Sequence, residues 1–276
     1  MLLAIDVGNT NMVLGLYARA SADAPRTLTH HWRLTTPLEL TEDEVRMRLR
    51  SLFAMDGIDT GVVTGIAIAS VVPPIDSLLR DAVEKTFSIK PLFIEPGVKT
   101  GLPVLTDNPA EVGADRIVNC VAAFERYGGP TIVVDLGTAT TFDVISAKGE
   151  FLGGAIAPGI GISADALFNK AARLSRINIR KPAKVVGTGT VDNIQIGLFY
   201  GYIGLIDGIC DRMIAEISPE TKVIATGGYA RLLAESSRRI ATVDDNLTLD
   251  GICMVFDRNA DRLRRRGQPT TTPQAG

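Results

Sequence analysis

The sequence predicts an α/β protein made of two similar domains, and two observations support this. First, the segment Ile5–Thr10 (IDVGNT) returns in type as Val134–Ala139 (VDLGTA), each time between two apolar runs. Second, strand-like apolar runs alternate with helix-like segments in both halves of the chain. A strand, a tight glycine turn and a second strand form a hairpin. We therefore expect a duplicated domain, with one hairpin in each copy and an aspartate ending its first strand.

The first half predicts a mixed sheet with two helices. Thr41 and Glu44 have the spacing of a capping box, which opens a helix that runs to about Met55. The run Gly65–Val72 is rich in Ile, Ala and Val and ends at two prolines, as expected of a buried parallel strand. The other expected elements are strands at 27–34 and 91–94, a helix at 75–87 and a Pro/Gly-rich connector at 96–112.

The second half repeats this order. The hairpin at 131–145 follows a helix at 113–127 and precedes a strand at 150–157. The later elements are helices from 160 to about 174, at 191–217 and at 250–264, and a strand at 222–225. These elements predict an N-terminal domain over 1–112, a C-terminal domain over 113–266 and a disordered tail over 267–276.

Composition indicates a folded, soluble protein. Of 276 residues, 46% are hydrophobic and 22% are charged, and the net charge of −2 gives no basic footprint for nucleic acid. The longest nearly apolar stretch, Val62–Val72, is too short to span a bilayer, and the N-terminus lacks the features of a secretion signal. Cys120, Cys210 and Cys253 are distant from one another, so we expect buried free thiols and a cytoplasmic location.

The long predicted helix carries Gly197, Gly201, Gly204 and Gly208 on one face. Each glycine disfavours the helix by roughly 1 kcal/mol relative to alanine, so the stripe needs a packing reason. Packing against another helix of the same chain and packing against a second subunit are both compatible with the sequence.

The two glycine turns are the first candidate site. In Asp6–Asn11, backbone amides and short side chains can converge on phosphate oxygens, and Asp6 can hold Mg²⁺ directly or through water. One such turn is common in proteins that bind no phosphate. The second copy, at Asp135–Thr138, makes chance less plausible and predicts a site for a polyphosphate and its cation.

The segment Gly113–Arg116 (GADR) is the second candidate site. It opens a predicted helix, where free amides and the helix dipole favour an anion. Arg116 can bind a carboxylate or phosphate, and Asp115 can accept a proton from an alcohol that attacks phosphorus. Taken alone, however, Asp115 is also an ordinary partner of the helix dipole, and Arg116 can pair with it.

Together these motifs resemble the type III pantothenate kinase family, also known as the Bvg accessory factor family. The resemblance covers about residues 1–257 and rests on the order and spacing of six segments. These are DVGNT at 6–10, GADRIVN at 113–119, VVDLGTATT at 133–141, GGAIAPG at 153–159, GTGT at 187–190 with QIG at 195–197, and TGG at 226–228.

The resemblance implies two ribonuclease H-like domains of the actin-like ATPase fold, each with a five-stranded mixed sheet flanked by helices. It implies a homodimer that phosphorylates pantothenate with ATP, Mg²⁺ and a monovalent cation, K⁺ or NH₄⁺, in the first committed step of coenzyme A synthesis. Asp115 is the implied proton acceptor, and Asp135 and Asp6 are the implied metal ligands. The implied ATP contacts are Asp6, Val7, Gly8, Asn9, Thr10, Asn11, Met12, Val13, Thr138, Gly227 and Gly228, and the implied substrate contacts are Gly113, Ala114, Asp115, Arg116 and Thr190.

One position departs from the family pattern, because Thr106 stands where many relatives carry an aromatic residue. Two other functions remain as alternatives. A phosphatase of the same fold would use water as acceptor and would need no pantothenate pocket. A nucleotide-binding regulator without turnover is supported only by the arginines near the chain end, Arg258, Arg262 and Arg264–Arg266. The adjacent His30 and His31 and the single Trp32 are interpreted as strand residues without a catalytic role.

Overall fold

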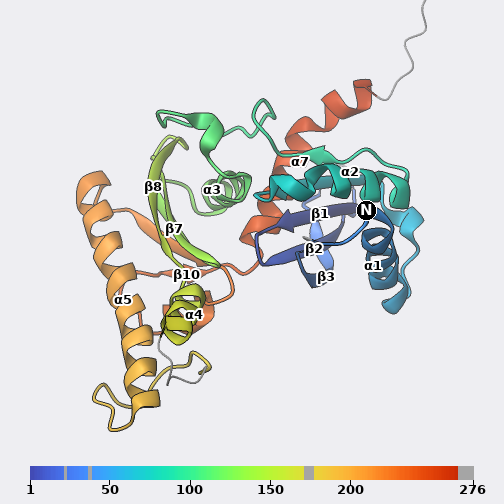
Figure 1. Ribbon diagram of the computed structural model, residues 1–276. Coiled ribbons are helices and arrows are strands. Elements are labelled where there is room, and N and C mark those ends of the chain that lie inside the picture. The colour runs from blue at the N-terminus through green and yellow to red at the C-terminus, as the bar shows by residue number, and fades with distance from the viewer. Residues whose placement is uncertain (22–23, 37–38, 171–176, 267–276) are drawn as a thin grey trace, which may run out of the picture. The chain divides into compact units, whose positions relative to one another are not determined.

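The computed structural model describes residues 1–276 except 22–23, 37–38, 171–176 and 267–276 (Figure 1). By its contacts the chain divides into two units. Unit 1 contains Met1–Gly101 and the residues from Leu249 onward, and unit 2 contains Leu102–Thr248. The domains expected at 1–112 and 113–266 remain a prediction about folding units. The expected tail at 267–276 lies outside the described residues.

Unit 1 contains a five-stranded mixed sheet in the order β3-β2-β1-β4-β5. Strands β1, β2 and β3 are antiparallel neighbours, whereas β4 is parallel to both β1 and β5. The strands are β1 (Leu2–Val7), β2 (Asn11–Ala18), β3 (Thr27–Thr35), β4 (Gly65–Ser70) and β5 (Leu92–Phe93). The predicted hairpin, third strand and buried parallel strand are confirmed.

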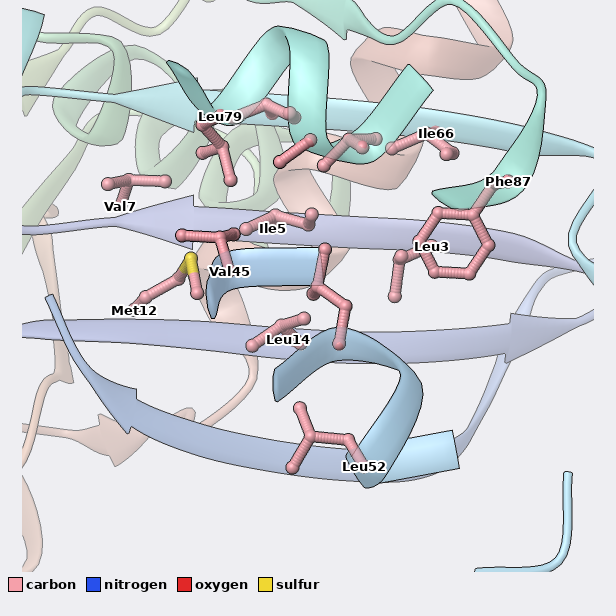
Figure 2. Close-up of a cluster of buried hydrophobic side chains, with 14 of the residues drawn as sticks. Leu3, Ile5, Val7, Met12, Leu14, Val45, Leu52, Ile66, Leu79 and Phe87 are labelled. Carbon is pink, nitrogen blue, oxygen red and sulfur yellow. The ribbon is translucent and has the colours of Figure 1, made fainter. Parts of the chain in front are cut away.

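Two helices cover one face of this sheet and form its core. Leu3, Ile5 and Val7 alternate along β1 and pack with Val45 of α1 (Glu42–Met55) and Leu79 of α2 (Pro73–Phe87) (Figure 2). The predicted capping box is present. The side chain of Thr41 accepts a hydrogen bond from the amide of Glu44, and the side chain of Glu44 accepts one from the amide of Thr41. Helix α2 begins at its two prolines, two residues before the predicted start, because proline suits the first helical turn.

The other face of the sheet is packed against α7 (Leu247–Arg266). The aromatic ring of Phe256 lies where a Cβ at Gly65 would stand, only 2.5 Å away, so the glycine lets the helix approach β4 closely. Tyr17 of β2 donates a 2.6 Å hydrogen bond to Asp250. The last helix of the chain therefore packs on the first sheet.

Unit 2 repeats this topology. Its strands are β6 (Thr131–Leu136), β7 (Ala139–Ile145), β8 (Phe151–Pro158), β9 (Lys222–Thr226) and β10 (Thr242–Val243). Their order is β10-β9-β6-β7-β8, with β6, β7 and β8 antiparallel and β9 parallel to both β6 and β10. Each unit thus has the same strand order relative to its first strand, and the predicted duplication is confirmed.

Helices lie on both faces of the second sheet. Phe199 and Ile206 of α5 (Thr190–Ile217) pack with Ile132 and Val134, while α3 (Ala114–Tyr127) lies over the opposite face of β6 and β7 (Figure 1). The remaining helices are α4 (Ile160–Lys170), α6 (Ala230–Ala234) and the short 3₁₀ turns η1 (Thr60–Val62) and η2 (Pro109–Glu111). The last four residues of the helix predicted from 160 to about 174 lie outside the described residues.

The predicted thiol state is confirmed, since all three cysteines are free and buried. Trp32 packs on Phe53 and His30, which confirms that it is a strand-packing residue. Within the part of the chain that the structure describes, no helix is long and apolar enough to cross a membrane.

Candidate active site

The turn between β1 and β2 is closed by backbone hydrogen bonds. The amide of Gly8 donates to the carbonyl of Asn11 at 3.0 Å, and the hydroxyl of Thr36 donates to the carbonyl of Gly8. A Cβ at Gly8 would lie 3.3 Å from that Asn11 oxygen, which is closer than most side chains tolerate. The glycine therefore allows the main chain to close tightly at this turn.

The eight residues predicted to contact ATP in this hairpin are not equally accessible. Val7 and Met12 are 0% and 2% exposed and belong to the unit 1 core, so only their main chain is available to a ligand. Asn9 and Thr10 are exposed at the turn, whereas Asp6, Gly8, Asn11 and Val13 are half-buried.

The second turn, between β6 and β7, is packed against the start of α4. Gly137 donates to the carbonyl of Ala139 at 3.0 Å, and Gly159 donates to the carbonyl of Thr138 at 3.0 Å. A Cβ at Gly159 would lie 2.2 Å from the Thr138 oxygen. The last glycine of the GGAIAPG segment, Gly159, is thus required for this close contact with the Thr138 carbonyl. Thr138 itself is exposed.

Gly227 of the TGG segment lies against Asp135. Thr226 of β9 pairs with Asp135 of β6, and the turn that follows brings Gly227 into contact with the Asp135 carboxylate. Gly227 has φ +93°, and a Cβ there would lie 2.5 Å from Oδ1 of Asp135. Gly228 is exposed beside it. The first glycine therefore has a packing reason of its own, in addition to the predicted contact with a nucleoside.

The segment Gly113–Arg116 opens helix α3, as predicted. Gly113 is the N-cap residue and provides no side-chain cap, and all four residues of the segment are half-buried. The amide of Arg116 donates to Oδ1 of Asp115 at 2.7 Å, which orients the carboxylate. Burial raises the pKa of Asp115 above its usual value, although the amide and guanidinium of Arg116 oppose the shift. A carboxylate with a raised pKa is a better proton acceptor than an exposed one.

Arg116 is held by a carboxylate that the sequence-based prediction missed. Its Nε donates to Oδ1 of Asp143 at 2.7 Å, and its Nη2 lies 2.5 Å from the same oxygen. The periodicity contained a signal for this residue. Asp143 pairs with Val133, and Asp135 pairs with Thr141, so the residues at 133, 135, 141 and 143 share one face of the sheet. That face is the one under α3.

Asp135 interacts with Asn119 of the same helix. The Asn119 amide donates to Oδ2 of Asp135 at 3.1 Å, and Asn119 itself is 0% exposed. Burial, together with the negative charge of Asp115, raises the pKa of Asp135 to about 7, although the Asn119 hydrogen bond opposes this shift. A positive charge beside Asp135 would favour its ionised form.

These groups fit the monovalent cation that the family resemblance implies. The Oδ1 atom of Asn119 is buried and has no hydrogen-bond partner among the described residues. An unpartnered amide oxygen next to a buried carboxylate supplies the oxygen ligands that hard cations prefer. Within the described residues, no group of three or more His, Cys, Asp or Glu side chains gathers as a metal cluster. A cation at Asp135 would therefore need further oxygen ligands from main chain, water or substrate.

The last predicted substrate contact, Thr190, and the departing position, Thr106, lie elsewhere in unit 2. Thr190 is the first residue of α5 and is exposed, next to an N-cap, Gly189, that has no capping side chain. The hydroxyl of Thr106, the position that departs from the family pattern, is buried and has no hydrogen-bond partner among the described residues. Its methyl group is the nearest atom to a Cβ built at Gly153 of β8, at 3.9 Å.

The duplicated sheets define the class of protein. The chain is similar to the activator of 2-hydroxyisocaproyl-CoA dehydratase from Clostridium difficile with bound ADPNP, with a TM-score of 0.54, 10% identity and coverage of 98% of this chain and 99% of that one. This similarity concerns the fold alone. The chain is thus an α/β protein of the actin-like ATPase fold.

The family follows from closer relatives. The family model described as type III pantothenate kinase matches residues 2–212. The chain is 55% identical over 270 residues to the type III pantothenate kinase of Koribacter versatilis, covering 96% of this chain and 98% of the relative. It is 56% identical over 257 residues to that of Acidobacterium capsulatum, covering 93% and 94%. The chain therefore belongs to the type III pantothenate kinase family and is a pantothenate kinase.

Proposed function

We propose that this chain transfers the γ-phosphoryl group of ATP to the primary hydroxyl of pantothenate, with Asp115 as the proton acceptor. The observation that carries the proposal is the position of Asp115, which lies in the first turn of α3 with its Oδ1 oriented by the Arg116 amide. The free amides and positive dipole end of that turn favour an anionic substrate. Family membership supplies the identity of that substrate.

The step needs positioning and charge stabilisation more than covalent chemistry. Asp115 accepts the proton of the hydroxyl as its oxygen attacks phosphorus, and its raised pKa suits this role. Arg116 binds the pantothenate carboxylate through its guanidinium. Gly113 and Ala114 contribute main-chain contacts beside it, and Thr190 contributes a hydroxyl.

For ATP, we assign the phosphate contacts to Asp6–Val13 and Thr138, and the nucleoside contacts to Gly227 and Gly228. The closed turn at Gly8 supports this assignment, because its residues Asn9 and Thr10 are exposed whereas the flanking core residues are not. The buried side chains of Val7 and Met12 restrict these two residues to main-chain contacts.

Asp6 would hold Mg²⁺, and Asp135 with Asn119 would hold K⁺ or NH₄⁺. When bound, these cations offset the negative charge of the phosphates. The unpartnered Oδ1 of Asn119 supports the monovalent site. The Asp115 carboxylate then orients the substrate hydroxyl and accepts its proton.

We also propose that the protein is a homodimer in the cytoplasm. A Cβ built at Gly197, Gly201 or Gly204 meets nothing within 4 Å among the described residues. The three glycines are exposed, so a packing partner inside the chain, one of the two alternatives, is not found in the described part of it. A second subunit is the remaining explanation for this glycine face. The free buried thiols are consistent with a reducing compartment.

The decisive experiment measures ADP release from ATP by the purified protein, with and without pantothenate, in K⁺ and then in Na⁺. We expect release that requires pantothenate and is faster in K⁺. Release without pantothenate would instead indicate a phosphatase, and no release under any condition would indicate a regulator.

Asp115→Asn tests the proposed base in the same assay. This change keeps the size of the side chain and removes its basicity, so we expect turnover to fall by about 10²-fold or more. Binding of pantothenate, measured by calorimetry, should change much less. Unchanged turnover would remove Asp115 from the mechanism.

A further inference from the structure

We propose that Asp143 is a positioning residue, which fixes the Arg116 guanidinium in the orientation that binds pantothenate. The inference rests on the proposed function, because it takes Arg116 as a substrate contact. Asp143 itself touches no substrate in this proposal and acts only through Arg116.

The first argument is the geometry of the contact. Two guanidinium nitrogens of Arg116, Nε and Nη2, converge on a single oxygen of Asp143, at 2.7 and 2.5 Å. The other oxygen of Asp143 accepts a 3.1 Å hydrogen bond from Thr141, two residues earlier on β7. Both carboxylate oxygens are therefore engaged, and the carboxylate cannot rotate without breaking one of these contacts.

Arg116 makes a second contact, with an aromatic ring. Its central carbon lies 5.4 Å from the centre of the Phe151 ring, within the range of a cation–π interaction. Together, the Asp143 ion pair and the neighbouring Phe151 ring restrict the rotation of the Arg116 side chain. Its Nη1 atom forms no hydrogen bond to any described residue, which leaves that side of the fork for a ligand.

The third argument is the distribution of burial. The Asp143 side chain is 0% exposed, whereas the Arg116 side chain is 16% exposed. A buried ion pair adds little stability compared with an apolar pair of similar size, so stability alone is a weak reason for it. In this ion pair the anion, Asp143, is buried and the cation, Arg116, stays partly accessible. This arrangement is expected when the anion orients a cation that binds a ligand.

The neighbouring strand leaves room for this arrangement. Gly154 of β8 pairs with Asp143, so a side chain at 154 would project from the same face of the sheet. A Cβ at Gly154 would come within 1.7 Å of the Phe142 carbonyl oxygen. The glycine therefore keeps β8 close to β7 and leaves the carboxylate uncovered by that strand.

The charges around the pair give Asp143 a second effect. Burial raises the pKa of Asp143 to about 6, against the opposing influence of Arg116 and Thr141. The other titratable groups near this site are two acids, Asp115 of α3 and Asp135 of β6, and the thiol of Cys120. Burial raises the pKa of this thiol well above its usual value. Arg116 thus interacts with two carboxylates, Asp143 and Asp115, and without Asp143 its guanidinium would be drawn toward Asp115.

The test compares Asp143→Asn with the wild-type enzyme. We expect the KM for pantothenate, and its Kd by calorimetry, to rise at least about tenfold, as when other residues that orient a binding side chain are changed. The KM for ATP should stay within about twofold. The matched control is Asp207→Asn, which alters another buried aspartate of unit 2 that pairs with an arginine, and it should leave the KM for pantothenate unchanged.

A double-mutant cycle separates positioning from a general structural role. If Asp143 acts through Arg116, Asp143→Asn should add less than about twofold to the KM for pantothenate in the Arg116→Ala background. Additive effects in the cycle, or an unchanged KM in Asp143→Asn, would overturn the proposal. Should Asp143→Asn fail to fold, Thr141→Val removes one hydrogen bond to the Asp143 carboxylate instead. Its KM for pantothenate should rise about two- to fivefold when Arg116 is intact and should not rise when Arg116 is alanine. An unchanged KM there would also overturn it.

Failure of the proposed function is distinguishable from failure of this inference. If the wild-type protein releases no ADP in response to pantothenate, the proposed function is wrong before any variant is measured. If the wild type is active and the Asp143 variants behave as the Asp207 control does, only the positioning role is wrong.

Discussion

At the scale of single residues, a constrained glycine of unit 2, Gly227, lies beside the acidic Asp135. Gly227 combines a left-handed backbone with a contact that leaves no space for a methyl group, because its neighbours are the carboxylate of Asp135 and the backbone of Leu136. The conformation and the clash have separate effects, and a matched pair of variants can distinguish them.

We predict that Gly227→Ala lowers the free energy of unfolding by about 2–4 kcal/mol, because strain and overpacking add. Gly97→Ala is the control, since Gly97 has nearly the same φ, +95° against +93°, but nothing lies within 4 Å of its Cβ. The control should lose only about 1 kcal/mol. Urea unfolding of both variants measures the difference, and equal losses would show that the contact with Asp135 does not matter.

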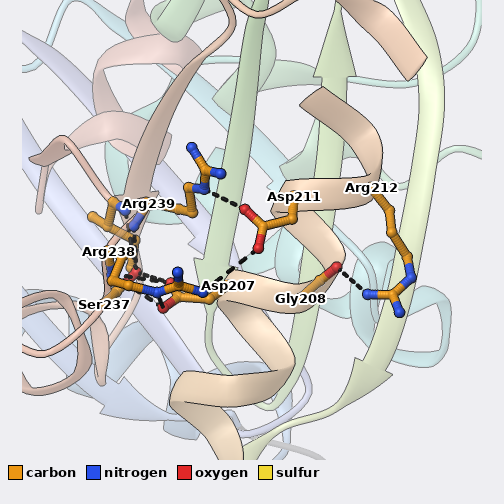
Figure 3. Close-up of polar contacts among 8 residues, drawn as sticks. Asp207, Gly208, Asp211, Arg212, Ser237, Arg238 and Arg239 are labelled. Carbon is orange, nitrogen blue, oxygen red and sulfur yellow. Dashed lines mark hydrogen bonds and ion pairs between the residues drawn. The ribbon is translucent and has the colours of Figure 1, made fainter. Parts of the chain in front are cut away.

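At the scale of elements, helix α5 is joined to the loop after α6 by a small polar network (Figure 3). Asp207 accepts hydrogen bonds from the Ser237 hydroxyl at 2.6 Å and from the Arg238 amide at 3.1 Å. Burial opposes ionisation of Asp207, but these bonds and the Arg238 guanidinium outweigh it and hold the pKa below its usual value. Asp211, one turn later, pairs with Arg239 at a more exposed position.

We predict that Asp207→Asn lowers the free energy of unfolding by about 1–3 kcal/mol at pH 7, because buried donors lose a charged acceptor. A carboxyl with a lowered folded pKa stabilises the protein above its unfolded pKa of about 3.8 and loses this effect as the pH falls through the folded value. The difference from wild type should therefore shrink as the pH falls below about 3.8. Asp211→Asn, on the same helix, should change stability by less than about 1 kcal/mol. A difference that persisted unchanged in acid would contradict this account.

At the scale of the whole molecule, duplication places an aspartate at the same point of both sheets. Asp6 and Asp135 are each the last residue but one of the first strand of their unit, next to a hairpin turn and a parallel neighbour. The units differ in what covers the sheet face to which these aspartates belong. In unit 1 this face is covered by α7, the last helix of the chain. In unit 2 the corresponding face is covered by α3, which carries Asp115, Arg116 and Asn119.

The glycine face of α5 leads to a prediction about assembly. We expect the wild-type protein to elute as a dimer in light scattering, and Gly201→Arg to shift it toward monomer, because a long charged side chain would stand in the interface. Glu216→Arg adds the same side chain to the same helix away from the glycines and should leave the dimer intact. A monomeric wild-type protein would refute the proposed interface.

The sequence allowed the prediction of most elements because their signals are local. The capping box at Thr41 and Glu44, the glycine turns and the apolar run at Gly65–Val72 each determine their own segment. The helix α6 and the strand β10 were missed, since five and two residues are too few to show a periodicity. For the site, the motifs predicted Asp115 and Asp135. The structure places Asp115 in helix α3 and Asp135 in the strand beneath it, β6.

By itself, then, the sequence determined the two hairpins, the boundaries of the main helices, the state of the thiols and, through its motifs, the family. Only the tertiary structure decided that Arg116 is held by Asp143, that an oxygen of Asn119 is left without a partner, and that the last helix packs on the first sheet. The physical reason is the range of the interactions. Turns, caps and strand alternation depend on neighbours in the chain, whereas these contacts depend on strand register and on which helix covers which face of each sheet.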